Sequence, residues 1–540
     1  MLRRSFIRVL ASGILFTLLS KQSRQSVARG RYAFEHGIAS GDPLADGLVI
    51  WTRVSAGEGE PVAVLWKVCG DAAMTTVLRE GVVETGPATD YTVKVDVRGL
   101  PCGARLYYQF SVEGVESPVG KSRTLPSGDV EEARFAVVSC SSYPTGYFHV
   151  YREIANRDDL DAVLHLGDYI YEYGIGGYAT EYAQELDRVP DPPGELMTLS
   201  DYRRRHAQYK ADPDSQAMHA AHPVIAIWDD HEIANDAWHS GAENHNDDEG
   251  GWAARRDAAI KAYFEWMPIR GEACGADTRI FRDFRYGNLL SLIMLDTRLY
   301  GRDMQPQISQ DMTPLEVEDV LNNPDRKMLG SYQQSWLRSS LERAAGTTWQ
   351  LIGQQVMVST LRSPDLGPLL DLERETPVPR EVLEFSVAMS KNNPPLLLDT
   401  WDGYAAARQN FLADLKAGAT NAVVLSGDLH TSLAGNLLLD GEDEPVAVEY
   451  MTTSVTSPGF ADYLPERRPG AVRDATLELN ANLQYMETER RGWLCMTLTS
   501  SSCTGEWHLI DGLRSREYTS SIDRVLTVEA GKVHSGLAEG

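Results

Sequence analysis

Two patterns of apolar and polar residues follow one another along the chain. From about residue 34 to 126, short runs rich in β-branched and aromatic residues are bounded by Gly, Asp and Pro. Such runs are typical of strands, and some of them also alternate between apolar and polar positions. Strands this short and this closely spaced predict a small β-sandwich similar to fibronectin type III or immunoglobulin domains. The clearest runs are 48–51, 62–68, 91–97 and 106–112.

The pattern changes after a polar, turn-rich stretch at residues 126–132, where we place the end of the sandwich. Beyond it, continuous apolar runs alternate with helical patterns such as 255–266 and 333–344. Fully apolar strands separated by helices predict an α/β domain over residues 131–540. Its expected strands are 135–138, 162–166, 224–228, 289–295, 349–352, 422–425 and 446–451.

Four of these apolar runs lead directly into side chains that can bind metals. Because the loops beyond the carboxyl ends of sheet strands form the usual crevice in α/β folds, we expect these side chains to lie together. Taken singly, each has an ordinary structural explanation, such as a turn or a buried thiol. Metal-binding side chains at the ends of four apolar runs of one domain predict a metal centre instead. The residues are Cys140, then Asp168 with Tyr171, then Asp230 with His231, and finally Asp428 with His430.

The charge balance of the chain is strongly acidic. The sequence has 51 Lys and Arg against 77 Asp and Glu, a formal net charge of -26 at pH 7. Specific binding of nucleic acid relies on Lys and Arg, so this balance argues against it. Acidic residues suit hard cations such as calcium, although solubility explains the charge more simply.

The N-terminus has the features of an export signal. Arg3 and Arg4 precede a short apolar run, residues 9–19, which is too short to cross a bilayer. This order resembles the twin-arginine signal, which implies the twin-arginine export machinery as a partner. We therefore expect a signal peptide at 1–28, a periplasmic or secreted protein, and no transmembrane span after processing. An uncleaved amphipathic anchor is the alternative.

The chain contains six cysteines, and export would permit disulfides among them. Cys69 with Cys102 and Cys495 with Cys503 are candidate pairs that the sequence alone cannot establish. If Cys140 is a metal ligand, five cysteines remain, so at least one of them must stay unpaired.

Several ordered motifs resemble those of the PhoD-type alkaline phosphatases, a branch of the calcineurin-like metallophosphoesterases. The resemblance runs from about residue 34 to the end of the chain. It implies an α/β sandwich with two central sheets flanked by helices, preceded by the N-terminal β-sandwich. The motifs are His36-Gly37-Ile38-Ala39-Ser40-Gly41-Asp42-Pro43, Gly167-Asp168-Tyr169-Ile170-Tyr171-Glu172, Trp228-Asp229-Asp230-His231-Glu232, Leu295-Asp296-Thr297-Arg298 and Gly427-Asp428-Leu429-His430.

The resemblance also implies two unequal metal ions that share one carboxylate. Thiolate and phenolate suit trivalent iron, and carboxylates suit calcium. A water activated by the metals would attack phosphorus, while His231 would stabilise the transition state or protonate the leaving oxygen. Arg298 could bind the substrate phosphate or form a structural ion pair. The implied ligands are Cys140, Asp168, Tyr171 and His430 for Fe³⁺, and Asp168, Asp230 and Asp428 for Ca²⁺, with Asp168 bridging.

The sequence therefore predicts an exported, metal-dependent phosphoester hydrolase that acts on small phosphate monoesters or diesters. A phospholipase D-like phosphodiesterase is the nearest alternative. A non-catalytic extracellular binding protein is an alternative of a different class. We find no long amphipathic helix near the C-terminus to act as a lid, so we expect open access to the site.

Overall fold

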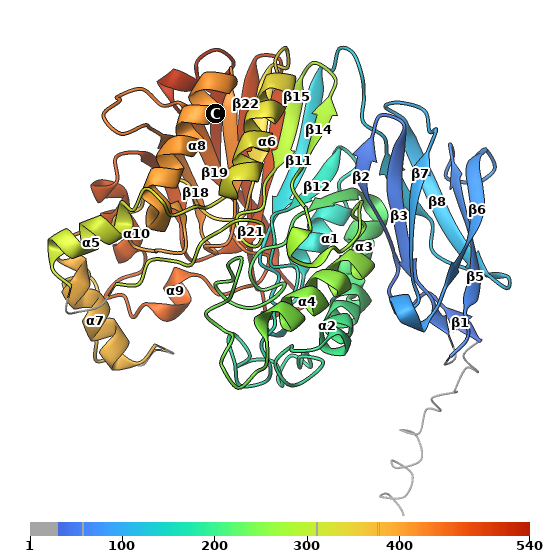
Figure 1. Ribbon diagram of the computed structural model, residues 1–540, viewed down its shortest axis with the longest axis horizontal. Helices are drawn as coiled ribbons and strands as arrows, with labels where there is room; N and C mark the ends of the chain where they lie inside the picture. The colour runs from blue at the N-terminus through green and yellow to red at the C-terminus, as the bar shows by residue number, and fades with distance from the viewer. Residues whose placement is uncertain (1–30, 57–58, 309–311, 375, 377) are drawn as a thin grey trace, which may run out of the picture.

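The computed structural model describes residues 31–56, 59–308, 312–374, 376 and 378–540 (Figure 1). The expected signal peptide at 1–28 lies outside the described residues. Within the described ranges, no helix combines the length and the apolar character that crossing a bilayer requires.

The larger of two central sheets has ten strands and runs through the middle of the molecule (Figure 1). Its central strands β11, β12 and β13 are parallel, and every residue of β12 and β13 is buried. Sheets covered on both faces need such continuous apolar strands, which is why the sequence predicted them. In spatial order the strands are β24 (Ala538–Glu539), β23 (Thr519–Glu529), β22 (Ser502–Asp511), β21 (Arg491–Thr499), β11 (Glu132–Val138), β12 (Ala162–His165), β13 (Pro223–Ala226), β2 (Ile38–Leu44), β3 (Gly47–Arg53) and β7 (Thr92–Arg98).

A second central sheet of seven strands packs against the first. Phe135 contacts Tyr286 edge-on and Tyr450 stacks on Trp507, so aromatic rings from both sheets meet in one core. This confirms the expected α/β sandwich with two central sheets. The strands in order are β14 (Arg282–Tyr286), β15 (Leu290–Met294), β16 (Trp349–Gly353), β17 (Ala422–Ser426), β19 (Ala447–Met451), β18 (Ser432–Leu437) and β20 (Leu483–Glu487).

Helices flank the two sheets on their outer sides (Figure 1). Helices α1 (His149–Ala155), α2 (Leu199–Ala211), α3 (Pro213–Ala221) and α4 (Trp252–Trp266) pack together beside the ten-stranded sheet. Helices α6 (Gly330–Arg343) and α8 (Ala405–Gly418) share a core with the seven-stranded sheet. The remaining helices are α5 (Pro314–Leu321), α7 (Arg380–Ser390), α9 (Phe460–Tyr463) and α10 (Ala471–Leu479).

The N-terminal region forms two sheets with a common core, as the sequence predicts for a β-sandwich. One of these sheets consists of β2, β3 and β7, and it continues into the ten-stranded sheet because Ser40 and Gly41 pair with Pro223 and Val224. The described C-terminus ends in strands, and no α-helix follows Leu479. The second sheet comprises β10 (Gly120–Arg123), β8 (Arg105–Val112), β5 (Val62–Cys69), β6 (Val77–Thr85) and β9 (Val115–Glu116), beside the short pair β1 (Tyr32–Ala33) and β4 (Ser55–Ala56).

The two candidate disulfides are wrong, because all six cysteines are free. Cys495 pairs with Glu506 across β21 and β22, whereas Cys503 pairs with Leu498. Side chains alternate between the two faces of a sheet, so Cys495 and Leu498 on the same strand face opposite sides. Cys503 faces the same side as its partner Leu498, and the two thiols therefore point in opposite directions.

Candidate metal centre

The four ligand-bearing loops meet where parallel strands of both central sheets end. The loops after β11, β12 and β13 come from the ten-stranded sheet, and the loop after β17 comes from the seven-stranded sheet. Glycines allow the close approach of these loops. A Cβ added to Gly167 would lie 2.3 Å from the Asp229 Cβ, and one added to Gly427 would lie 2.6 Å from the Ser139 Oγ.

Four of the predicted ligands have left-handed backbone conformations. The φ angles are 61° at Cys140, 53° at Asp168, 65° at Asp428 and 55° at His430. Non-glycine residues adopt this region at a cost of about 1–3 kcal/mol each, and they concentrate at functional sites. All four residues belong to the groups of metal-ligating side chains described below, and the sequence pattern does not reveal their backbone conformation.

The first group of ligands contains Cys140, Asp168 and His430, whose donor atoms all lie within 4.8 Å of one another. The Tyr171 hydroxyl joins this group, 3.0 Å from Asp168 Oδ2 and 3.2 Å from His430 Nε2. His430 Nδ1 lies 2.8 Å from the Pro458 carbonyl oxygen, so it carries the proton and leaves the Nε2 lone pair available. The structure therefore brings together the four side chains expected around iron.

Two further groups overlap with the first through shared carboxylates. Asp168, Asp230 and His231 form one group, and Asp229, Asp230 and Asp428 form the other. The predicted ligand sets thus merge into one continuous cluster in which Asp168 and Asp230 each belong to two groups. Asp229 was not among the predicted ligands, although it directly precedes Asp230 in the same motif.

The charges of this cluster fit bound cations. Asp230 Oδ1 and Asp229 Oδ2 are buried and have no hydrogen-bond partner among the described residues, and the only ion pair of Asp230 Oδ1 in those residues is with Arg298 Nη2, 3.5 Å away. Burial raises the pKa of Asp168 well above its usual value and raises that of Asp428 to about 6. Buried carboxylates with unsatisfied oxygens are costly unless a cation compensates them. The donor set is therefore suited to metal ions.

Arg298 is the cation nearest to these carboxylates, and its side chain is completely buried. It donates hydrogen bonds to Asp229, to Asp399 at 2.5 Å and to Asp428 at 2.8 Å. Arg298 also holds the pKa of Asp230 near 2, although burial alone would raise it. With its guanidinium enclosed by carboxylates, Arg298 matches the ion-pair alternative better than direct contact with a substrate phosphate.

Two glutamates that the sequence did not single out hold the centre in place. Glu232 accepts hydrogen bonds from the backbone N–H groups of Asp168, at 2.9 Å, and Asp229, at 2.7 Å, and so ties two loops together. Glu172 Oε2 lies 2.7 Å from His231 Nδ1. Both glutamates belong to the quoted motifs, so the available signal was their position next to predicted ligands.

A cavity of about 250 Å³ opens onto the cluster and is lined by five of its residues. The rest of its lining is partly apolar and aromatic and includes Tyr178, Leu397, Leu429, Phe460 and Tyr463. A cavity of this size admits a small ester, and its wall could contact the alcohol group. The five cluster residues in the lining are Asp168, Asp230, His231, Asp428 and His430.

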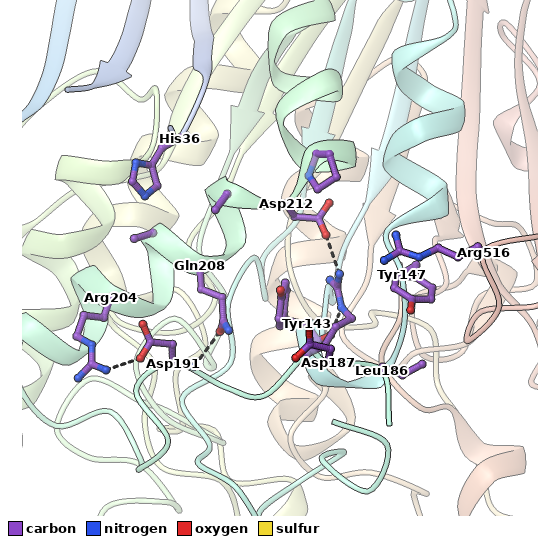
Figure 2. A pocket seen from close by; sticks show the side chains of 14 residues that line it. His36, Tyr143, Tyr147, Leu186, Asp187, Asp191, Arg204, Gln208, Asp212 and Arg516 are labelled. Carbon is purple, nitrogen blue, oxygen red and sulfur yellow. Dashed lines mark hydrogen bonds and ion pairs between the residues drawn. The ribbon is translucent and has the colours of Figure 1, made fainter. Parts of the chain in front are cut away.

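A second cavity of about 490 Å³ lies elsewhere and contains none of the predicted ligands (Figure 2). Its charged side chains are largely paired with one another. Arg188 forms an ion pair with Asp212, and a dashed line in Figure 2 marks the ion pair of Arg204 with Asp191. The lining of the 490 Å³ cavity contains no cluster of metal-ligating atoms among the described residues. We therefore assign the chemistry to the 250 Å³ cavity, although it is the smaller of the two.

An α/β sandwich of two facing sheets, with a buried cluster of metal-ligating side chains where their parallel strands end, matches the fold and site expected of phosphoric ester hydrolases. Comparison with family models narrows this class. The model of the PhoD-like phosphatases matches residues 135–507, and that of their N-terminal domain matches residues 20–126. The chain belongs to the PhoD-like phosphatase family.

Two known proteins show how far the similarity extends. Alkaline phosphatase D of Bacillus subtilis (strain 168) is 35% identical over 495 residues, which cover 89% of this chain and 78% of that protein. A solved structure of PhoD is 31% identical, with a TM-score of 0.80 over 94% of this chain and 92% of that one. The expected family, fold class and phosphoric ester hydrolase activity are confirmed, and the non-catalytic alternative loses its support.

Proposed function

We propose that this protein is an exported phosphoester hydrolase whose centre holds a ferric ion and a calcium ion. The observation that carries the proposal is a chain of overlapping ligand groups, in which buried Asp168 links Cys140 and His430 to Asp230, and Asp230 in turn lies within ligand distance of Asp428. The twin-arginine-like N-terminus and the acidic charge support a periplasmic or secreted enzyme without specific nucleic-acid binding.

Different residues would hold the two ions. Cys140, Tyr171 and His430 would bind iron, Asp230 and Asp428 would bind calcium, and Asp168 would contact both. When bound, the two ions supply Lewis acidity for activating water and positive charge for the phosphoryl oxygens. Arg298 positions the proposed ligand Asp428 by donating a hydrogen bond to it at 2.8 Å.

His231 is suited to donate a proton to the leaving oxygen. It lines the cavity, and Glu172 orients its imidazole through Nδ1. Burial alone would lower the pKa of His231, but Asp230, Glu172 and Asp168 together raise it well above its usual value. A protonated imidazole held against the cavity can stabilise negative charge on the phosphoryl group and then act as general acid.

Replacing His231 with alanine should reduce kcat by about 10²–10⁴-fold, the usual contribution of a positioned acid or base. Iron and calcium contents should stay at their wild-type values, because the imidazole is not a proposed ligand. Steady-state kinetics and elemental analysis of the same preparation provide the measurement. Full activity in this variant would refute the proposed role.

Replacing Tyr171 with phenylalanine should remove a visible absorption band from the iron-containing enzyme. The Tyr171 oxygen lies among the donor atoms of the first group, and phenolate bound to ferric iron absorbs visible light by charge transfer. Tyr178 provides a matched control, because its ring stacks on that of Tyr171 with centroids 5.8 Å apart, but Tyr178 is not a proposed ligand. The Tyr178→Phe enzyme should remain coloured; a colourless, active, iron-containing wild type would contradict the assignment.

A phosphodiesterase of the phospholipase D type is the second candidate, and the aromatic cavity wall favours it. Phe460 and Tyr463 offer apolar surface for the second alcohol group of a diester. Elemental analysis combined with hydrolysis of a chromogenic monoester and a chromogenic bis-ester tests both proposals. Preferential cleavage of the bis-ester selects the second candidate, and two zinc ions without iron or calcium would contradict the proposed metals.

A further inference from the structure

A second cluster of metal-ligating side chains lies on the outer face of the ten-stranded sheet. Cys495 of β21 and Glu506 of β22 are directly paired across the two strands, and His508 follows on β22. One donor atom from each residue lies within 4.8 Å of the other two, and Glu506 Oε2 is 3.4 Å from His508 Nε2. A thiol, a carboxylate and an imidazole are therefore within reach of one ion.

The alternation of side chains places this cluster away from the catalytic centre. Trp507, between Glu506 and His508, points into the core between the sheets and stacks on Tyr450 of β19. Its two neighbours on β22 consequently face the opposite side, toward α1. None of the three cluster residues lines the catalytic cavity.

The side chains around the cluster restrict the orientation of His508. Its ring stacks on Trp493 with centroids 4.3 Å apart, and Trp493 Nε1 donates a hydrogen bond to Glu153 Oε2 at 3.3 Å. Ser520 Oγ donates to the same carboxylate oxygen at 2.9 Å. A fixed imidazole loses less freedom on binding an ion, and Glu153 adds a nearby negative charge.

Two arginines near Cys495 are already engaged with other carboxylates. Arg157 donates two hydrogen bonds to Asp159, at 2.7 and 2.8 Å. Arg157 also contacts the Cys495 thiol, so an ion bound by Cys495 would replace that contact. Arg134 also binds Asp159 and lies 3.1 Å from Glu132. Their charges are thus balanced by Asp159 and Glu132, which leaves Glu506 and Glu153 to balance a bound cation.

We propose that Cys495, Glu506 and His508 form a second metal site, which takes a divalent ion of the zinc type. Thiolate and imidazole ligands select zinc over calcium, which takes oxygen ligands. Three protein ligands leave a fourth tetrahedral position for water. The ion would link β21 to β22 and stabilise the folded state by binding to it selectively.

The test measures zinc bound to the holoenzyme, whose catalytic centre is already occupied. Wild-type enzyme is incubated with zinc chloride, freed of excess ion and analysed for zinc, iron and calcium. It should retain about one zinc per chain more than the Cys495→Ala and Glu506→Gln variants. Glu506 is partly exposed, so its glutamine variant keeps the result interpretable if the cysteine variant folds poorly.

Cys274→Ala is the matched control, because Cys274 is an exposed free thiol outside the cluster. This control should retain the additional zinc, and all variants should keep wild-type iron, calcium and phosphoester hydrolysis. The proposal is overturned if wild-type enzyme binds no additional zinc, or if both cluster variants bind as much as wild type. Because hydrolysis is measured separately, failure here leaves the proposed catalytic function untouched.

Discussion

Replacing Arg298 with methionine should lower the midpoint of thermal unfolding by about 3–5 °C and deplete the calcium ion. Its guanidinium is buried between Asp229, Asp399 and Asp428. Asp229 and Asp428 would lose their ion-pair partner, whereas Asp399 would keep its ion pair with Arg302. Removing one member of a buried ion pair costs about 3–5 kcal/mol. The entropy of unfolding of a chain this long is about 1 kcal/mol/K, which converts that cost into the stated shift.

Thermal unfolding followed by circular dichroism, with calcium analysis of the same samples, measures both effects. The matched control is Arg338→Met, because Arg338 also binds a carboxylate, that of Asp414 at 2.8 Å, but its side chain is 56% exposed. Exposed ion pairs contribute little, so this control should unfold within about 1 °C of wild type. Equal midpoints for the Arg298 variant and wild type would show that its ion pairs do not hold the centre together.

Replacing Asp168 with asparagine should lower kcat/KM by at least about 10³-fold. Asp168 lies within ligand distance of Cys140 and His430 on one side and of Asp230 on the other, so the amide would weaken the binding of both proposed ions at once. The Lewis acidity and charge that metal ions supply amount to several kcal/mol, and about 4 kcal/mol corresponds to a thousandfold. Kinetics on a phosphate monoester and elemental analysis provide the measurement.

Asparagine has nearly the same shape as aspartate, so the Asp168 variant should remain folded and its circular dichroism should match that of wild type. Asp158→Asn serves as a control for the substitution itself, because Asp158 is an exposed carboxylate paired with Lys121. That control should keep wild-type activity and metals. An Asp168→Asn enzyme with full iron content and more than a tenth of wild-type activity would exclude Asp168 as the shared ligand.

The predicted ligands were accessible from the sequence because each one directly follows an apolar strand. Residues 135–138 and 162–165 are completely buried, and the ligands lie in the loops that follow them. Parallel strands that alternate with helices must end at the same edge of their sheet, so local order was enough to bring Cys140 and Asp168 together. The resemblance to a known family then gave the residues specific expected roles.

The partners of those ligands depended on contacts between distant parts of the chain. Glu172 contacts His231, 59 residues away, and Arg298 contacts Asp428, 130 residues away. A sequence motif identifies a glutamate or an arginine, but it does not show which distant side chain that residue will contact. The sequence does not show whether Arg298 contacts the substrate or forms an ion pair. Its complete burial among carboxylates, seen only in the folded structure, favours the ion pair.

By itself, the sequence determined the two structural regions and the α/β class, because hydrophobic periodicity fixes which elements form and which faces they bury. It also indicated the candidate metal ligands, because side chains able to bind metals follow four of the apolar runs. Only the tertiary structure decided that the N-terminal strands continue the central sheet, through the pairing of β2 with β13. It also separated Cys495 from Cys503 and placed Cys495 beside Glu506 and His508. Strand register and sheet order carry no local sequence signal, since backbone groups of any two strands can pair.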